Sequence, residues 1–197
     1  MKRIFVFAWL VLLFSGILYI FWYNDWKYSL PTPVPHNYHA VLQGTFIDLK
    51  GEIPNTAHKP VFIHFFNPDC PCSRFNIPHF KSLVKQYGNK IRFAVVVLNE
   101  NYTAKQVQDK YDLDIPILFD SSIAASCGVY STPQAVLLDA QHHLYYRGNY
   151  NKSRYCTDPG SNYAQMAIDT LLSNDPTPVL DANAFKAYGC QLSTCRK

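Results

Sequence analysis

An uncharged, apolar run near the N-terminus, Ile4 to Tyr23, limits the architecture more than any other feature of the chain. A helix needs about 20 apolar residues to cross the hydrocarbon core of a bilayer, and this run has that length. Lys2 and Arg3 precede it, which favours a cytoplasmic N-terminus. We therefore predict a transmembrane anchor at residues 1–23, with the rest of the chain outside the cytoplasm.

A cleaved signal peptide is the alternative interpretation of this segment. Signal peptides have a shorter apolar region, followed by small residues at the cleavage site. Here the apolar run is long and is followed by FWYNDWKYSL. Trp22, Tyr23 and Trp26 in that stretch have the position of an aromatic belt at a membrane interface. The pattern favours an uncleaved anchor.

The remaining chain divides by composition into three parts. Residues 24–40 are polar, aromatic and rich in proline, which is typical of a semi-rigid spacer. About 155 residues follow, enough for one domain with its own core. We assign residues 41–175 to that domain and residues 176–197 to a cysteine-containing C-terminal tail.

Charge and glycine patterns exclude two classes of partner. The net charge is +4, and the basic residues are scattered rather than gathered in a stripe. Since no nucleic-acid-binding motif accompanies them, we expect no nucleic-acid partner. The glycines are also scattered, and none forms a phosphate-binding loop, so we predict no cofactor.

Beyond the spacer, short apolar runs alternate with helix-like patterns. The expected strands are 60–66, 91–98, 115–119, 135–138 and 143–147. The expected helices are 71–87, 103–111 with Thr103 as N-cap, 121–127 and 161–172. This order predicts an α/β fold with a central mixed β-sheet flanked by helices. Periodicity supports a fold class and does not reach function.

The most specific stretch reads FFNPDCPCSRFNIPHF, residues 65–80. It places Cys70 between an expected strand and an expected helix, with Pro78 inside that helix. Later, residues 128–133 (GVYSTP) lead into a strand that is followed by residues 146–148 (YRG). Together these features resemble the thioredoxin-like superfamily, and most closely its membrane-anchored, extracytoplasmic thiol-disulfide oxidoreductases of the TlpA and ResA type.

The resemblance implies a thioredoxin-like fold with a reactive thiol where the first long helix begins, which is Cys70 here. It also implies a cis-proline loop facing that thiol, at Thr132 and Pro133, where the Thr132 backbone receives an incoming peptide. The implied partners are thiols and disulfides of bacterial envelope proteins. The implied location is the inner membrane, with a single pass and the C-terminal domain in the periplasm.

The chain departs from the family in the active-site motif itself. Such oxidoreductases usually carry Cys-x-x-Cys, whereas this chain reads Cys70-Pro71-Cys72-Ser73. The second cysteine has moved one position earlier, and serine stands in its usual place. Asn76 occupies a helix position where the family often has an acidic residue. The ordinary two-cysteine shuttle therefore does not follow from the motif.

Position still favours Cys70 as the nucleophile. A cysteine where a helix begins faces unpaired backbone N–H groups and the positive end of the helix dipole. Both favour the thiolate, which is the form that attacks disulfides and binds metals. Pro71 suits the first helical turn because its missing N–H has no partner there. Arg74, one turn on, would add positive charge.

The cysteine that resolves a mixed disulfide stays open among several candidates. The chain has 6 cysteines, and sequence cannot choose their pairing. Cys72 is nearest, and its bond to a residue two positions away would close a small, easily reduced ring. Cys127 and the tail residues Cys190 and Cys195 are the alternatives. A local Cys190–Cys195 disulfide and a structural disulfide at Cys156 are equally compatible with an oxidising compartment.

Two other functions compete with thiol-disulfide exchange. Cys70 and Cys72 could bind copper(I) as soft thiolates, with His64 or His79 as a further ligand. Thioredoxin-fold copper chaperones of the Sco type use such a set, but their cysteines are normally three residues apart, and packed histidines are the simpler interpretation. The other competitor is a non-catalytic adaptor whose cysteines are disulfide staples. We predict an oxidoreductase in which Cys70 attacks and Cys72 or a tail cysteine resolves.

Overall fold

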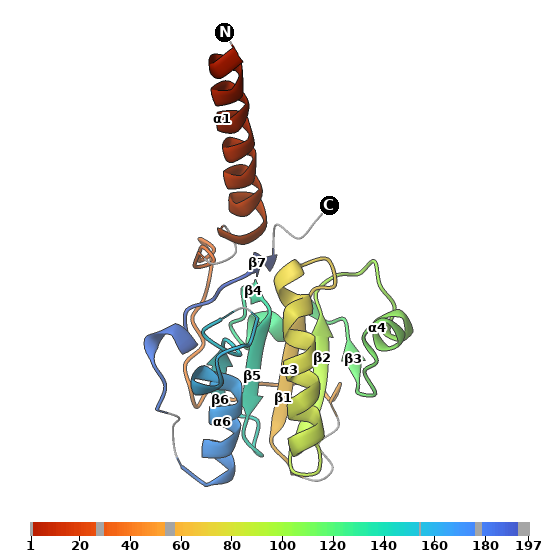
Figure 1. Ribbon diagram of the computed structural model, residues 1–197. Helices are drawn as coiled ribbons and strands as arrows, with labels where there is room; N and C mark the ends of the chain where they lie inside the picture. Colours follow the sequence, from red (N-terminus) through yellow and green to blue (C-terminus); the bar gives the residue numbers. More distant parts are fainter. Residues whose placement is uncertain (1, 27–29, 54–57, 154, 176–178, 193–197) are drawn as a thin grey trace. The chain divides into compact units, whose positions relative to one another are not determined.

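The computed structural model describes residues 2–26, 30–53, 58–153, 155–175 and 179–192 (Figure 1). The chain divides into two compact units, Met1–Leu30 and Pro31–Lys197. Each unit is described by itself below.

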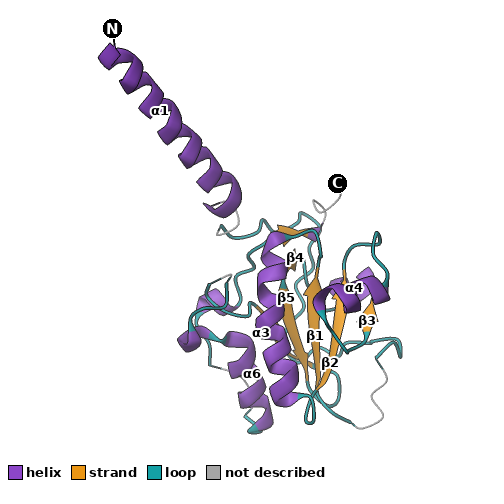
Figure 2. Ribbon diagram, turned by 45° about the vertical axis from the view of Figure 1, so that its right-hand side comes forward, coloured by secondary structure: helices purple, strands orange, loops and turns teal. Residues whose placement is uncertain are grey.

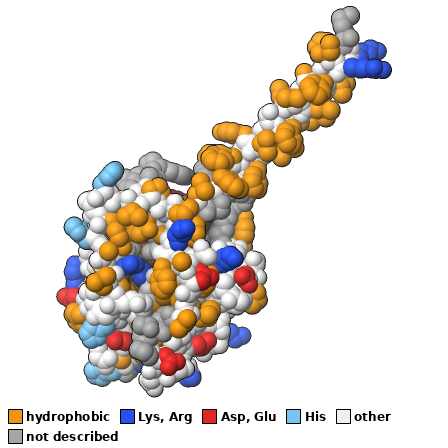
Figure 3. All heavy atoms as spheres, turned by 90° about the vertical axis from the view of Figure 1, so that its left-hand side faces the viewer, with side chains coloured by type: hydrophobic (Ala, Val, Ile, Leu, Met, Phe, Trp, Pro, Cys, Tyr) orange, Lys and Arg blue, Asp and Glu red, His pale blue; other side chains and the backbone are white. Residues whose placement is uncertain are grey.

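The first unit is the predicted N-terminal helix. It consists of α1 (Lys2–Phe21), continued by a π-helical turn, η1 (Trp22–Trp26). None of the α1 side chains is buried, and Figure 3 shows apolar side chains along its length with basic ones at its N-terminal end. Within the part of the chain that the structure describes, α1 is the one helix whose length and composition suit a membrane span.

The second unit is built on a five-stranded mixed sheet in the order β3-β2-β1-β5-β6 (Figure 1). β1 pairs in parallel with β2, and β2 with β3. β1 pairs antiparallel with β5, and β5 with β6. The strands are β1 (Val61–Phe66), β2 (Arg92–Val97), β3 (Ile117–Leu118), β5 (Gln134–Leu138) and β6 (Leu144–Gly148). The mixed sheet predicted from the apolar runs is confirmed.

Helices and loops cover both faces of this sheet (Figure 2). On one face, Phe62 and Phe66 of β1 pack in a core with Phe80 of α3. On the other face, Ile63 of β1 packs with Ile123 of α5. β1 is buried throughout because both of its faces are covered, which explains its unbroken apolar sequence. The helices are α3 (Pro71–Tyr87), α4 (Ala104–Tyr111), α5 (Ser121–Ser126) and α6 (Tyr163–Leu172), with short 3₁₀ turns η2 (Pro159–Ser161) and η3 (Ala182–Ala184).

A small second sheet joins the predicted domain, residues 41–175, to the predicted tail, residues 176–197. It consists of β4 (Ser131–Thr132) and β7 (Cys190–Gln191), paired antiparallel. The Thr32 amide, in the predicted spacer, donates to the Ala187 carbonyl oxygen in the predicted tail at 2.8 Å. Residues 31–40 of the predicted spacer and the described part of the tail therefore belong to the same compact unit as the domain. The tail backbone pairs with the domain, and the spacer backbone pairs with the tail.

Candidate redox site

The site is centred on Cys70, the residue that precedes α3. Cys70 has an extended backbone (φ −83°, ψ 118°), and its carbonyl oxygen accepts from the Ser73 amide at 3.1 Å. Pro71 occupies the first helical position, as predicted. The first turn of α3 has no acidic residue, so the dipole of the helix acts unopposed within that turn in favour of a thiolate at Cys70.

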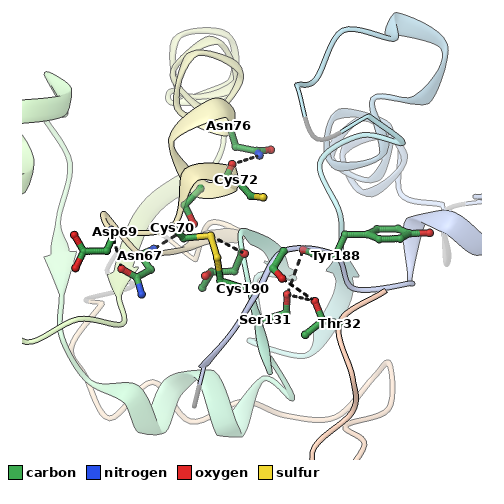
Figure 4. Close-up of a disulfide and its surroundings, with 12 residues drawn as sticks. Thr32, Asn67, Asp69, Cys70, Cys72, Asn76, Ser131, Tyr188 and Cys190 are labelled. Atoms are coloured by element: carbon green, nitrogen blue, oxygen red, sulfur yellow. Dashed lines mark hydrogen bonds between the residues drawn. A yellow bond between two sulfur atoms is a disulfide. The ribbon is translucent and has the colours of Figure 1, made fainter. Parts of the chain in front are cut away.

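Cys70 forms a disulfide with Cys190 (Figure 4). The two residues are 120 positions apart in the sequence, and their Cα atoms are 6.2 Å apart, within the usual range of about 4.4 to 6.8 Å. The local Cys190–Cys195 disulfide considered from the sequence is therefore wrong for this state, because the Cys190 sulfur is bonded to Cys70. Cys195 itself lies outside the described residues.

Thr132 and Pro133 lie beside this disulfide, as the thioredoxin resemblance implied. The Thr132–Pro133 peptide bond is cis. The Thr132 carbonyl oxygen lies 3.7 Å from the Cys70 sulfur, and Thr132 stands opposite Cys190 in the β4–β7 pair. The structure thus brings three of the four predicted site residues together with a tail cysteine.

Cys72, the fourth predicted site residue, is a thiol rather than half of a disulfide. It is 2% exposed, and Figure 4 shows its sulfur on the first turn of α3, apart from the Cys70–Cys190 bond. The Asn76 side chain donates to the Cys72 carbonyl oxygen at 3.1 Å. Cys72 therefore lies next to the site while Cys190 takes the position bonded to Cys70.

Cys127 and Cys156 are also thiols. Burial raises the pKa of each of them to about 12. Both stay protonated at neutral pH and are poor nucleophiles. Cys127 is fully buried against apolar neighbours, so it behaves as a small core residue, and Cys156 donates to the Asn76 side-chain oxygen at 3.1 Å.

Two hydroxyl groups that the sequence analysis missed hold the tail in place. The Thr32 hydroxyl lies 3.1 Å from the Ser131 hydroxyl and 3.3 Å from the Gly189 carbonyl oxygen. The Ser131 hydroxyl lies 3.2 Å from the Tyr188 carbonyl oxygen. Neither residue belongs to a periodic pattern. The one local signal was Gly189, directly before Cys190. Glycine is typical of positions where two backbone segments approach closely, here the tail and its neighbours.

The copper alternative gains no support from the arrangement of side chains. Across the described ranges, no group of three or more His, Cys, Asp or Glu side chains could hold a metal ion. His64 of β1 is buried, stacked on Phe80 with ring centroids 4.6 Å apart, and its Nδ1 atom lies 2.7 Å from the Tyr150 hydroxyl. Burial lowers the pKa of His64 to about 3 and also lowers the pKa of His79. Both fit the simpler interpretation of packed histidines.

His64 makes stability depend on pH. Its pKa is about 3 in the folded chain against 6.5 for the free side chain, so between these values the unfolded chain binds the proton and the folded chain does not. Stability should fall as pH decreases through this window, by up to about 1.4 kcal/mol per pH unit for one proton. Urea unfolding at several pH values should show a smaller acid loss for His64→Phe than for the wild type. Replacement of the exposed His36 by glutamine is the control, and equal acid losses in His64→Phe and wild type would contradict the assignment.

Two comparisons of sequence bear on this arrangement. The model of a family described as a domain of unknown function (DUF6436) matches residues 39–194. The thioredoxin-like protein YneN of Bacillus subtilis is 34% identical over 97 residues, a match that covers 46% of this chain and 56% of that protein. The chain therefore spans little more than half the length of this curated relative.

Solved structures share the fold at low sequence identity. A hypothetical protein from Sinorhizobium meliloti is 16% identical with a TM-score of 0.61, over 79% of this chain and 96% of that chain. An uncharacterized conserved protein from Geobacillus kaustophilus is 19% identical with a TM-score of 0.61, over 82% of this chain and 97% of that chain. Together with the sheet order and the thioredoxin-like relative, these likenesses confirm the thioredoxin-like fold.

Proposed function

This chain belongs to the DUF6436 family, and we propose that it acts as a thiol-disulfide oxidoreductase through Cys70 and Cys190. The observation that carries the proposal is the disulfide between them, placed where α3 begins and against Thr132 of β4. There the positive end of the helix dipole stabilises a Cys70 thiolate. The sulfur of Cys190, which lies 120 positions further along the chain, is already bonded to the Cys70 sulfur.

The exchange runs in two balanced steps. In the reduced chain, the Cys70 thiolate attacks one sulfur of a partner disulfide, and the other partner sulfur leaves as a thiolate. The Cys190 thiolate then attacks the Cys70 sulfur, and the second partner sulfur leaves. The partner gains two electrons and two protons as two thiols, while Cys70 and Cys190 become a disulfide. A partner dithiol and the oxidised chain run the same steps in reverse.

Cys190 therefore takes the resolving role for which the sequence offered Cys72 or a tail cysteine. Cys190 is bonded to Cys70, whereas Cys72 is a buried thiol. In this assignment Cys72 is a packed residue of the first turn of α3.

We further propose that the chain is anchored by α1 in a bacterial inner membrane and acts on envelope proteins. The length and composition of α1 support the anchor, and Lys2 and Arg3 support a cytoplasmic N-terminus. A domain with its redox pair as a disulfide suits the periplasm, because that compartment is oxidising.

The function is tested by equilibrating the full chain, in detergent micelles, with graded ratios of reduced and oxidised glutathione. Thiols are then trapped by alkylation and the cysteines are mapped by mass. We expect one reversible pair, Cys70–Cys190, to open and close across the series. Cys72 should be found alkylated, and therefore as a thiol, at every glutathione ratio. A Cys70–Cys190 bond that resists even the most reducing mixture would instead indicate the structural staple of an adaptor.

A further inference from the structure

The tail lies on the site as an extended peptide would. Residues 190–192 run antiparallel to residues 130–132, with Cys190 opposite Thr132. The Leu192 amide donates to the Tyr130 carbonyl oxygen at 3.2 Å. Backbone pairing of this kind is how a sheet edge binds an extended peptide strand.

A second set of contacts holds the preceding part of the tail, residues 187–189. The Thr32 amide donates to the Ala187 carbonyl oxygen at 2.8 Å, and Pro31 forms an antiparallel bridge with Tyr188. The hydroxyls of Thr32 and Ser131 lie within 3.3 Å of the carbonyl oxygens of Gly189 and Tyr188, respectively. Each of these contacts is made to the backbone of the tail. The cradle formed by residues 31, 32 and 130–132 therefore accepts an extended chain through its backbone groups.

Gly189 is the position where the cradle does depend on residue type. Its φ is +124°, a conformation that L side chains rarely adopt. A Cβ atom added there would collide with the Thr132 carbonyl oxygen and crowd the Pro133 ring. A residue with a side chain is thus excluded by both backbone conformation and space directly before the cysteine that reaches Cys70.

We propose that this cradle selects partner segments in which glycine directly precedes the reacting cysteine, and that residues 187–192 are a resident copy of such a segment. The proposal rests on the proposed exchange function and names its substrate class. In the reduced chain the tail leaves the cradle, and a Gly-Cys segment of the partner takes its place. Cys70 attacks that cysteine of the partner disulfide and expels the second partner sulfur as a thiolate. The returning Cys190 then displaces the partner cysteine.

The first test uses two peptides that correspond to residues 187–192, one with the natural sequence AYGCQL and one with alanine for glycine, AYACQL. Each is supplied as a mixed disulfide with glutathione. The protein is the reduced full chain with Cys190→Ser and Cys195→Ser, so that no tail thiol competes. Mass spectrometry follows the Cys70–peptide adduct that forms as glutathione leaves. We expect the glycine peptide to react faster by about tenfold or more, the factor that a strained backbone position costs.

The outcomes distinguish the proposal of glycine selection from the proposed exchange function on which it rests. Equal adduct rates for the two peptides would contradict glycine selection and leave the exchange function standing. No Cys70 adduct with either peptide would contradict the exchange function itself.

A second test keeps all cysteines and changes the resident copy. Gly189→Ala should shift the equilibrium of Cys70–Cys190 in glutathione toward the dithiol by about tenfold, because the tail then fits its cradle poorly. Gly160→Ala is the matched control, since its added Cβ would approach the Asp158 carboxylate no closer than 3.4 Å. An unchanged equilibrium in Gly189→Ala would overturn the proposal.

Discussion

Replacing Cys70 with serine will remove the acceleration of thiol-disulfide exchange by this chain and leave only the rate of the glutathione buffer. A serine hydroxyl does not ionise near neutral pH, so the helix dipole has no thiolate to stabilise. Neither the mixed disulfide nor the Cys70–Cys190 bond can then form. The measurement is the steady-state reduction of a disulfide-bonded Gly-Cys peptide by glutathione, with the full chain in micelles.

Cys127→Ser is the matched control for this loss. Cys127 is a buried thiol whose pKa is raised to about 12 by burial, and it takes no part in the proposed steps. Its variant should retain the acceleration. If Cys70→Ser accelerated the exchange as much as the wild type does, Cys70 would be ruled out as the nucleophile.

Replacing Cys190 with serine, together with Cys195, will make the mixed disulfide accumulate. The first step needs only Cys70, so the partner still becomes attached. The second step needs a sulfur at the place opposite Thr132, which the variant lacks. On non-reducing gels, the adduct with a disulfide-bonded partner should rise to most of the chain, whereas in the wild type it should remain a small fraction.

Cys72→Ser distinguishes the two resolving cysteines that the sequence allowed. In the structure Cys72 is a thiol with no bond to Cys70, and it is only 2% exposed. We therefore expect this variant to turn over without accumulating the adduct. Accumulation in Cys72→Ser, and turnover in the Cys190 variant, would transfer the resolving role to Cys72.

The parts of the fold that could be predicted are those encoded by local pattern. The run VFIHFF indicated β1 because a strand covered on both faces needs apolar residues on both. Pro71 marked the beginning of α3, and Thr103 caps α4 with Gln106 in a reciprocal capping box. Cys70 stood out because cysteine, proline and a helical pattern coincide there. These signals lie within a few residues of the features they predict.

The pairing of Cys70 with Cys190 could not be predicted in this way. It joins residues 120 positions apart, and the strands that bring them together, β4 and β7, have two residues each. Two residues are too few to show an alternation of apolar and polar side chains. Thr32 was missed because it acts through one amide and one hydroxyl, and the proline-rich stretch around it has no periodic pattern.

The identity of the trapped cysteine decides whether Cys70 is the nucleophile. The Cys190→Ser, Cys195→Ser chain is reduced, mixed with a disulfide-bonded partner, quenched with acid and digested, and the peptide that carries the partner is found by mass. We expect the partner to be attached at Cys70, where α3 begins. Attachment at Cys72, or no attachment at any cysteine, would contradict this assignment.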